Sequence, residues 1–369
     1  MREYTKDDYG FLWLDLVDDI TLVKKIRVAH ILKNGSNMWN LAKFKNELLD
    51  VLEESEYNKL ISSYDDKRFN SFLKLTLSKN VNFITLNSPE YPEILKKTAN
   101  PPFILYYIGD LELLSSSCIA IVGSRLHSNY GTVVTEKYAK ELAFNGFTIV
   151  SGLAEGIDAI AHNACLDIKG KTIAVLCGGL DRIYPSINTN LARRIVKSGG
   201  LLISENRLGV EPQKFLFPIR NRIIAGLSIA VILTEAQEKS GTKHTINYAT
   251  DANRNIYCVP SSILNERGVY GNQLIKACQT FMTLSPQDVV EDLGFKYKDS
   301  QALKRKEIIN DVDDAGKVRK ILEGAESVHF DEILKKSQMD IKNLNSMLTK
   351  LELSGIIKKL PGNFYMLCN

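Results

Sequence analysis

The sequence predicts an α/β protein built around a doubly wound parallel sheet, with a small helical domain before the sheet and a winged helix after it. Between residues 117 and 260, continuous apolar runs alternate with helical patterns, as is typical of strands covered by helices on both faces. Residues 11–79 show helical spacing alone. Residues 317–369 combine short helices with a terminal pair of strands. Together these observations predict three structural parts in that order.

The composition is that of a folded, nearly neutral chain. Of the 369 residues, 44% are hydrophobic and 24% are charged, and 47 Lys and Arg against 43 Asp and Glu give a net charge of +4. At about 100–200 residues per domain, this length allows two or three domains. Residues 1–80 carry 13 basic and 13 acidic side chains, and residues 301–369 carry 12 and 10. A site for a polyanion must therefore be a local cluster of cations.

The sequence shows no targeting or metal-binding signal. The first residues are acidic where an export signal is basic, and the longest apolar run, residues 223–233, is too short to span a bilayer. The six cysteines form no CxxC pair, which argues against a zinc site or a disulfide framework. We therefore expect a cytoplasmic protein with reduced thiols, no membrane insertion, no metal and no cofactor.

Residues 1–80 are expected to form a helical domain of the SAM-like or helix-hairpin type, with Asn34-Gly35 as an internal stop signal. The pattern changes at Val81, where β-branched and aromatic runs begin, and we expect the α/β domain to cover residues 81–295. Its expected strands are VNFITL (81–86), FILYYIG (103–109), CIAIVG (118–123), FTIVSG (147–152), TIAVLCGG (172–179), GLLISE (200–205), IAVILTEA (229–236) and NIYCVP (255–260). Its expected helices lie at residues 130–145, 156–168, 189–198 and 242–253.

The C-terminal part is expected to be a winged helix-turn-helix over residues 315–369, after a charged linker at residues 296–314. Its expected helices cover residues 317–323, 329–336 and 340–353, and two short strands flank Pro361-Gly362. The last helix would be the recognition helix of a transcription regulator, which is one alternative function. This helix has two cations, Lys342 and Lys350, and two amides, Asn343 and Asn345. These are few side chains for a helix that reads base edges.

The first strand of the α/β repeat ends in Gly123, Ser124 and Arg125. In doubly wound sheets, ligands bind at the carboxyl ends of the strands, where a glycine turn and the next helix N-terminus face an anion. The guanidinium of Arg125 suits a phosphate. The loop lacks the GxGxxG pattern, so no dinucleotide cofactor is indicated. An ordinary turn with a solvated arginine fits the same residues.

Three other strand ends are rich in glycine and hydroxyl side chains. They contain Ser151-Gly152, Cys177 to Asp181, and Ser240-Gly241 after Glu235. Such residues allow a close approach of an extended ligand and offer neutral donors to phosphate oxygens. Each is more often a turn than a site, but the carboxyl ends of parallel strands share one edge of the sheet, which favours a common site.

The segment from Lys214 to Arg222, KFLFPIRNR, holds three cations, two aromatics, an amide and no acid. Single-stranded nucleic acid is bound by such combinations, since cations follow the backbone and an aromatic ring stacks on a base. Pro218 would restrict the backbone that presents Phe217. The alternative is a buried pair of phenylalanines with arginines that donate to carbonyl groups.

Histidines near the expected strand ends are the place to look for a catalytic base. His162 lies on the helical pattern IDAIAHNAC, and His127 and His244 lie close to strand ends. No Ser or Cys stands with a His and a carboxylate at a spacing that supports nucleophilic catalysis, so we expect a structural or hydrogen-bonding role for His162.

The stretches IAIVGSRLHSNYG, IVSGLAEGIDAIAH, KTIAVLCGGLDRIYP, LLISEN, FPIRNRIIAGLS, TEAQEKSGT and GNQLI resemble the DprA/Smf family of bacterial DNA-processing proteins. The resemblance covers roughly residues 91–293, and it implies an extended Rossmann fold, often with a helical N-terminal domain and a C-terminal winged helix. It also implies a homodimer, formed through the Rossmann domain, that is not an enzyme. This dimer would bind single-stranded DNA, protect incoming strands during natural transformation and load the RecA recombinase onto them.

The resemblance also implies which residues bind single-stranded DNA. Those carried over by motif are Gly123, Ser124, Arg125, Ser151, Gly152, Lys214, Phe217, Arg220, Asn221, Arg222, Ser240 and Gly241. An enzymatic alternative is a nucleotide phosphoribohydrolase on a similar core. That group has a PGGxGTxxE loop, and the nearest equivalents here, CGGLD and SGT, do not keep its order.

Overall fold

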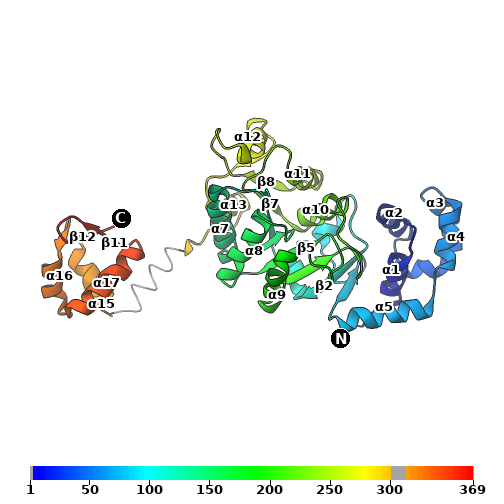
Figure 1. Cartoon of the computed structure of the whole chain (residues 1–369), viewed down its shortest axis with the longest axis horizontal. Coiled ribbons are helices and arrows are strands. Elements are labelled where there is room, and N and C mark those ends of the chain that lie inside the picture. The colour runs from blue at the N-terminus through cyan, green and yellow to red at the C-terminus, as the bar shows by residue number, and fades with distance from the viewer. Residues whose placement is uncertain (1–2, 301–312, 369) are drawn as a thin grey trace. The chain divides into compact units, whose positions relative to one another are not determined.

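The computed structural model describes residues 3–300 and 313–368. The chain divides into two compact units, residues 1–297 and 298–369, and each is described by itself (Figure 1). The linker expected at residues 296–314 lies largely outside the described residues, since residues 301–312 are not among them. Within the described ranges, no helix has both the length and the apolar character that a membrane crossing needs.

A nine-stranded sheet forms the centre of the first unit, in the order β1-β2-β6-β5-β4-β3-β7-β8-β9. The strands from β6 to β9 along this order pair in parallel, whereas β1 and β2 are antiparallel to their neighbours. The predicted α/β fold is thus confirmed, with an antiparallel edge that the sequence pattern did not reveal. The strands are β1 (Asn82–Thr85), β2 (Ile104–Gly109), β3 (Cys118–Val122), β4 (Thr148–Ser151), β5 (Thr172–Leu176), β6 (Leu201–Ser204), β7 (Ala230–Leu233), β8 (Asn255–Cys258) and β9 (Phe281–Met282).

Alternate residues of the central strands enter two separate cores. In β3, Ile119 and Ile121 pack against α7 and α8, while Ala120 and Val122 face the core that includes α10 and α11. Both faces of the sheet are covered, which explains the continuous apolar runs of the sequence. The helices of this part are α6 (Glu93–Lys96), α7 (Asn129–Phe144), α8 (Ile157–Asp167), α9 (Thr189–Lys197), α10 (Leu216–Leu227), α11 (Thr242–Asp251), α12 (Val269–Lys276) and α13 (Pro286–Asp292), with short 3-10 turns η2 (Leu111–Ser115), η3 (Ser186–Asn188) and η4 (Glu266–Gly268).

The strand order reverses at β3. From β3 the chain proceeds through β4, β5 and β6 on one side, and then crosses to β7, β8 and β9 on the other. In a doubly wound sheet the connections leave opposite faces at this point, and a crevice opens at the carboxyl ends of the two strands. The loops after β3 and β7 therefore flank the place where a ligand is expected.

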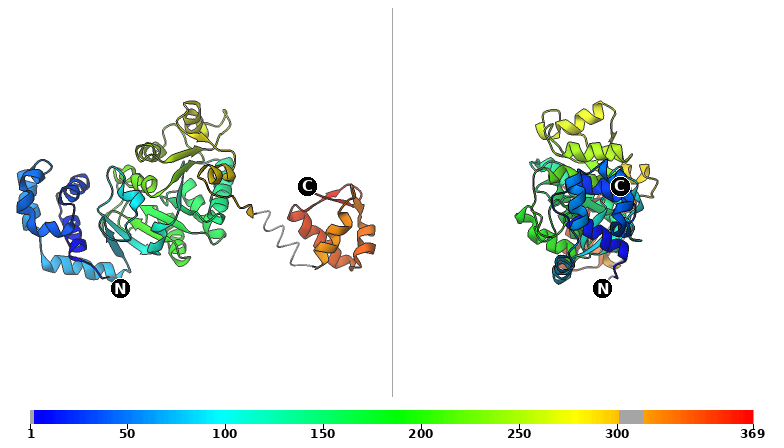
Figure 2. Two further views of the ribbon diagram at one scale, coloured as in Figure 1. Left: turned by 180° about the vertical axis from the view of Figure 1, so that it is seen from behind. Right: turned by 90° about the vertical axis from the view of Figure 1, so that its right-hand side faces the viewer.

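The N-terminal helices pack against β1 and β2 at one end of the sheet, and the left view of Figure 2 shows them beside that end. They are α1 (Lys6–Leu16), α2 (Leu22–Leu32), η1 (Gly35–Phe44), α3 (Lys45–Leu49), α4 (Glu54–Ser62) and α5 (Asp66–Ser78). Phe11 of α1 lies beside Phe103, and Tyr4 stacks on Phe83 of β1 at a ring distance of 4.2 Å. One hydrophobic core thus runs from these helices into the sheet.

Asp8 joins α1 to the end of β1. Its carboxylate accepts hydrogen bonds from the backbone and hydroxyl of Thr5, both at 2.9 Å, from Thr85 Oγ1 at 2.7 Å and from Ser88 Oγ at 3.1 Å. Burial by itself raises the pKa of Asp8, but these hydrogen bonds outweigh it and lower the pKa below the ordinary 3.8.

This pKa shift predicts a loss of stability in acid. An Asp with a lowered pKa in the folded state stabilises the fold above its unfolded pKa, and that contribution is lost as the pH falls below 3.8 through the folded value. We expect Asp8→Asn to melt at a lower temperature at pH 7 and to show a weaker pH dependence between pH ~2 and ~4. Melting curves across this pH range test it. The exposed Asp50→Asn control should follow the wild type.

The second unit is a small helical domain with a three-stranded sheet in the order β10-β12-β11. Its elements are α15 (Asp313–Leu322), β10 (Val328–His329), α16 (Phe330–Ser337), α17 (Ile341–Leu353), β11 (Ile357–Leu360) and β12 (Phe364–Leu367). The predicted winged helix is confirmed, with β10 added to the expected strand pair. Lys342 and Lys350 of α17 are exposed, but the Asn343 amide donates to Asp340 at the helix N-cap.

Candidate nucleic-acid interface

A cavity of about 390 Å³ lies at the carboxyl ends of β3 and β7, where the strand order reverses. Its walls come from the loop after β3, the start of α8, one face of α10 and the segment that joins β7 to α11. This is the location at which doubly wound sheets bind ligands. The sequence-predicted residues that line it are Gly123, Ser124, Arg125, Phe217, Arg220, Asn221, Ser240 and Gly241.

The loop after β3 is held close to the sheet. Ser124 N donates to Glu235 O at 2.7 Å, and Ser124 O accepts from Ile157 N at 3.2 Å. A Cβ at residue 123 would lie 2.7 Å from both Glu235 O and the Ile157 side chain, so glycine is required for this close approach. The next residue, Arg125, is exposed at the rim of the cavity.

Three side chains are in contact with one another at this rim, with Phe217 in the middle. The guanidinium carbon of Arg125 lies 5.2 Å from the centre of the Phe217 ring, and Tyr184 meets that ring edge to face at 5.7 Å. Phe217 is half-buried, while 47% of Tyr184 is exposed. Aromatic and guanidinium planes of this kind are the surfaces on which unstacked bases pack.

Helical periodicity determines which residues of the KFLFPIRNR segment face the cavity. It forms the start of α10, where Pro218 is the third helical residue and removes no helical hydrogen bond. Phe217, Arg220, Asn221 and Ile224, spaced three or four residues apart, all line the cavity. Residues 214 and 222 lie elsewhere.

Arg220 is part of the cavity floor. It is 6% exposed, and its Nη1 donates to Gly152 O and to Val175 O, each at 2.5 Å. Burial lowers the pKa of this guanidinium, and the charge of Asp158 opposes that effect. Asp158 in turn accepts from Gly152 N at 3.1 Å. Arg220 therefore joins the ends of β4 and β5, which is the carbonyl-bonding role weighed as the alternative for this segment.

Ser151 and Gly152, predicted to line the site, are buried behind it. Ser151 Oγ donates to Ile121 O at 2.7 Å. A Cβ at residue 152 would collide with the Arg220 guanidinium, so the glycine makes room for that side chain. Both residues support the floor of the cavity.

Arg222 and Lys214 also lie away from the cavity. The Arg222 side chain is 10% exposed, pairs with the buried carboxylate of Glu205 and donates to Asn100 O at 2.6 Å. It borders a smaller cavity of about 70 Å³ beside Tyr248. Lys214 is exposed in the turn that precedes α10.

The segment before α11 contributes hydroxyls and a cation. Thr242 Oγ1 donates to Gly123 O at 3.1 Å, and Ser240 Oγ accepts from Thr242 N at 3.2 Å. This joins the Ser240-Gly241 segment to the loop that carries Arg125. Lys239, which is exposed, lines the cavity from the same segment, so both loops contribute a cation.

Sequence reasoning missed two residues of this interface. Lys239 directly precedes the predicted Ser240-Gly241 pair, and Tyr184 follows the glycine-rich end of β5. Lys239 lies in the stretch TEAQEKSGT and Tyr184 in KTIAVLCGGLDRIYP, each next to the end of a predicted strand. Their position next to a predicted strand end was the signal, although it could not show that Tyr184 reaches Phe217.

His162 is fully buried behind this edge. Thr172 Oγ1 donates its proton to Ile149 O, so it can only accept from His162 Nδ1 at 2.7 Å. Burial, together with the Arg220 charge, lowers the pKa of His162 to about 3. The side chain is therefore a neutral, hydrogen-bonded core residue, as expected from the sequence.

Comparison with known proteins identifies the class to which this fold and edge belong. Residues 82–294 match the family model described as DNA recombination-mediator protein A, and residues 306–363 match the DprA winged helix domain. These are DNA-binding proteins of DNA processing and recombination. The chain belongs to the DprA family.

Individual relatives agree with this assignment. The chain is 44% identical over 240 residues to Protein Smf of Synechocystis, a match that covers 64% of this chain and 60% of that protein. The structure of DNA processing protein A from Streptococcus pneumoniae superposes with a TM-score of 0.65 and 30% identity over 80% of this chain and 100% of the other. DNA processing protein A from Helicobacter pylori, described for its single-stranded DNA binding mode, gives a TM-score of 0.52 and 32% identity over 59% and 97%.

Proposed function

We propose that this chain binds single-stranded DNA at the cavity beyond the carboxyl ends of β3 and β7. The observation that supports this most is the cluster of Arg125, Phe217 and Tyr184 at a rim that also carries Lys239. Cations neutralise phosphates, and aromatic planes receive bases that are free to leave a helix. In a duplex the bases are already stacked, so single strands should be preferred.

The contacts divide into two groups. Arg125, Phe217, Asn221, Ser240 and Gly241 line the cavity with Gly123 and Ser124, and we assign them direct contact with the strand. Lys214, which is exposed and does not line the cavity, would contact the strand outside it. Ser151, Gly152, Arg220 and Arg222 hold the loops that carry these residues. Phosphate contacts position a strand without reading its bases, so sequence preference should be weak.

Family membership supports a role beyond binding. We propose that the protein acts in the cytoplasm as a mediator and not as an enzyme: it protects incoming single strands in natural transformation and loads RecA onto them. A homodimer formed through the Rossmann domain would present two such cavities, and one strand that spans both would bind with avidity. The proposed domains are residues 1–80, 81–295 and 315–369.

A salt titration of Arg125→Ala tests the binding site. For wild type, log Kd for an oligo-dT strand should depend linearly on log salt. Loss of one phosphate contact should reduce that slope by about 0.7. Fluorescence anisotropy between low and moderate salt, with single- and double-stranded oligonucleotides, measures both the slope and the preference for single strands.

Arg193→Ala is the matched control, because Arg193 is exposed on α9 and does not line the cavity. It should keep the wild-type slope. Equal slopes for wild type, Arg125→Ala and Arg193→Ala would place the strand elsewhere, and an equal affinity for duplex would contradict the single-strand assignment.

A further inference from the structure

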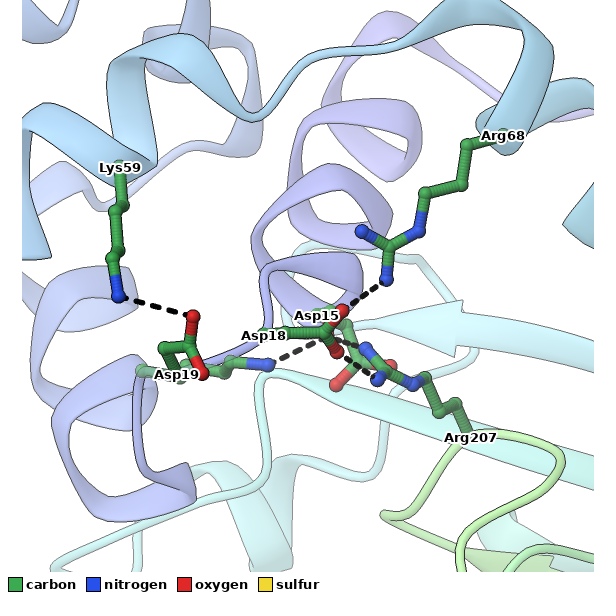
Figure 3. A network of polar contacts seen from close by, with 7 residues as sticks. Asp15, Asp18, Asp19, Lys59, Arg68 and Arg207 are labelled. Atoms are coloured by element: carbon green, nitrogen blue, oxygen red, sulfur yellow. Dashed lines mark hydrogen bonds and ion pairs between the residues drawn. The ribbon is translucent and has the colours of Figure 1, made fainter.

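The N-terminal helices contact the loop that leads from β6 into α10. Arg207, in that loop, donates Nη1 to Asp15 O at 2.7 Å and Nη2 to Asp18 Oδ1 at 2.5 Å. Arg68 of α5 pairs with the other Asp18 oxygen at 2.6 Å. Figure 3 shows Asp18 between the two arginines, one from the N-terminal helices and one from the sheet domain.

Buried groups hold the far side of this contact. Tyr106 of β2 donates its hydroxyl to Asp15 Oδ2 at 2.6 Å, and the nearly buried Lys25 donates to Asp15 O at 2.6 Å. Burial raises the pKa of Asp18, but the hydrogen bonds from Arg207 and Arg68 outweigh it and lower the pKa. The ionised Asp18 is thus fixed between its two partners at neutral pH.

The same loop is tied to the helix that carries Phe217. Glu205, two residues before Arg207, is 2% exposed and pairs with Arg222 of α10. Arg222 points away from the cavity, on the opposite side of the helix from Phe217. The loop therefore connects the turn after α1, through Asp18, to the middle of α10, through Arg222, by two ion pairs.

A second connection runs from this loop to Tyr184. Gly209 N donates to Asp181 Oδ1 at 2.9 Å, and Gly179 N donates to Val210 O at 2.9 Å. Asp181 and Gly179 lie in the segment after β5 that continues to Tyr184. The two rings that meet at the rim of the cavity are thus both supported by the loop that Arg207 holds.

We propose that the N-terminal helices position the DNA-binding aromatics, through the contact of Asp18 and Arg207, in addition to completing the core. This inference rests on the proposed function. Stacking surfaces bind well only when a supporting layer of hydrogen bonds holds their orientation. Asp18 and Arg207 are positioning residues, since both Arg207 amino groups are already engaged by the N-terminal segment.

Asp18→Ala tests the inference, because a purely electrostatic role and a positioning role of Asp18 predict opposite changes in DNA affinity. Removing a negative charge should by itself strengthen binding of a polyanion, because electrostatic repulsion falls. Loss of positioning should weaken binding instead, by about 3- to 10-fold, as is typical of changes in a supporting network. The salt slope should stay at the wild-type value, because no phosphate contact is lost.

The adjacent Asp19 offers a matched control. It pairs with Lys59 at 3.1 Å inside the N-terminal helices and makes no contact with Arg207. Asp19 has a positive φ of 66°, a conformation that asparagine tolerates better than alanine, so the control is Asp19→Asn. It removes the same charge one residue away and should bind oligo-dT as tightly as wild type or slightly more tightly. Arg207→Lys keeps the charge with a shorter reach and should recover only part of the affinity that Arg207→Ala loses.

Anisotropy of the full chain with oligo-dT, at a temperature where melting curves show every variant folded, separates the outcomes. Weaker binding by Asp18→Ala than by Asp19→Asn, at an unchanged salt slope, supports the inference. Binding by Asp18→Ala equal to or tighter than by Asp19→Asn overturns it, as does a slope for Arg207→Lys that differs from wild type. Failure of the wild type to bind single strands would instead overturn the proposed function.

Discussion

Replacing Phe217 with alanine is expected to weaken binding of single-stranded DNA by about 1–3 kcal/mol, or about 5- to 150-fold, because a base loses its stacking surface. The loss should lie in the upper part of this range. Phe217 also lies 5.2 Å from the Arg125 guanidinium and 5.7 Å from the Tyr184 ring, so its removal leaves both neighbours without support.

Titration of oligo-dT at several salt concentrations measures this effect, with Phe215→Ala as the control. Phe215 lies two residues earlier, is 60% exposed and does not line the cavity. Because Arg125 lies on Phe217, the double variant Arg125→Ala/Phe217→Ala should lose less binding free energy than the sum of the losses of the two single variants. Additive losses, or an equal loss for Phe215→Ala, would show that the two side chains act separately or that stacking occurs elsewhere.

Replacing Arg220 with alanine is expected to lower the free energy of unfolding by about 3–5 kcal/mol, as is typical when one member of a buried charged set is removed. Gly152 O and Val175 O would lose their donor, and Asp158 would keep its buried charge with less compensation. Burial already raises the pKa of Asp158, and the Arg220 charge opposes that rise.

Urea unfolding measures the loss, with the exposed Arg193→Ala as the control. Arg220 was predicted from the motif to contact DNA, and the two roles make different predictions. If Arg220 is structural, Arg220→Ala should lower stability, and the fraction of the variant that is folded should retain much of its affinity for DNA. Unchanged stability with a large loss of affinity would instead place Arg220 in direct contact with the strand.

The parallel part of the sheet was predictable because strands buried on both faces are continuous apolar runs. CIAIV and TIAVL are fully buried in the structure. The antiparallel edge was not predictable, since β2 pairs with β6, nearly a hundred residues later in the chain, and a short apolar run does not encode the direction of its partner. The two-residue strands β9 and β10 are too short to give a periodic signal.

The site was predictable at the level of strand ends and not of individual arginines. Arg125 and Ser240 follow buried strands, so topology alone brings them to one edge. The sequence of the KFLFPIRNR segment indicates a cluster of cations and aromatics, but it does not by itself predict a helix there. Residues two positions apart on an α-helix point about 200° away from each other. Arg220 and Arg222 therefore necessarily face different surroundings. Only the helix assignment separates them.

The shared core of the N-terminal helices and the sheet has a consequence for how this chain can vary. Because Phe11 packs beside Phe103 and Tyr4 on Phe83, the N-terminal helices cover apolar side chains of the β1–β2 end of the sheet. A descendant that lost them would expose the edge of the sheet to self-association unless other substitutions made it polar. The C-terminal unit, in contrast, has a hydrophobic core made of its own residues.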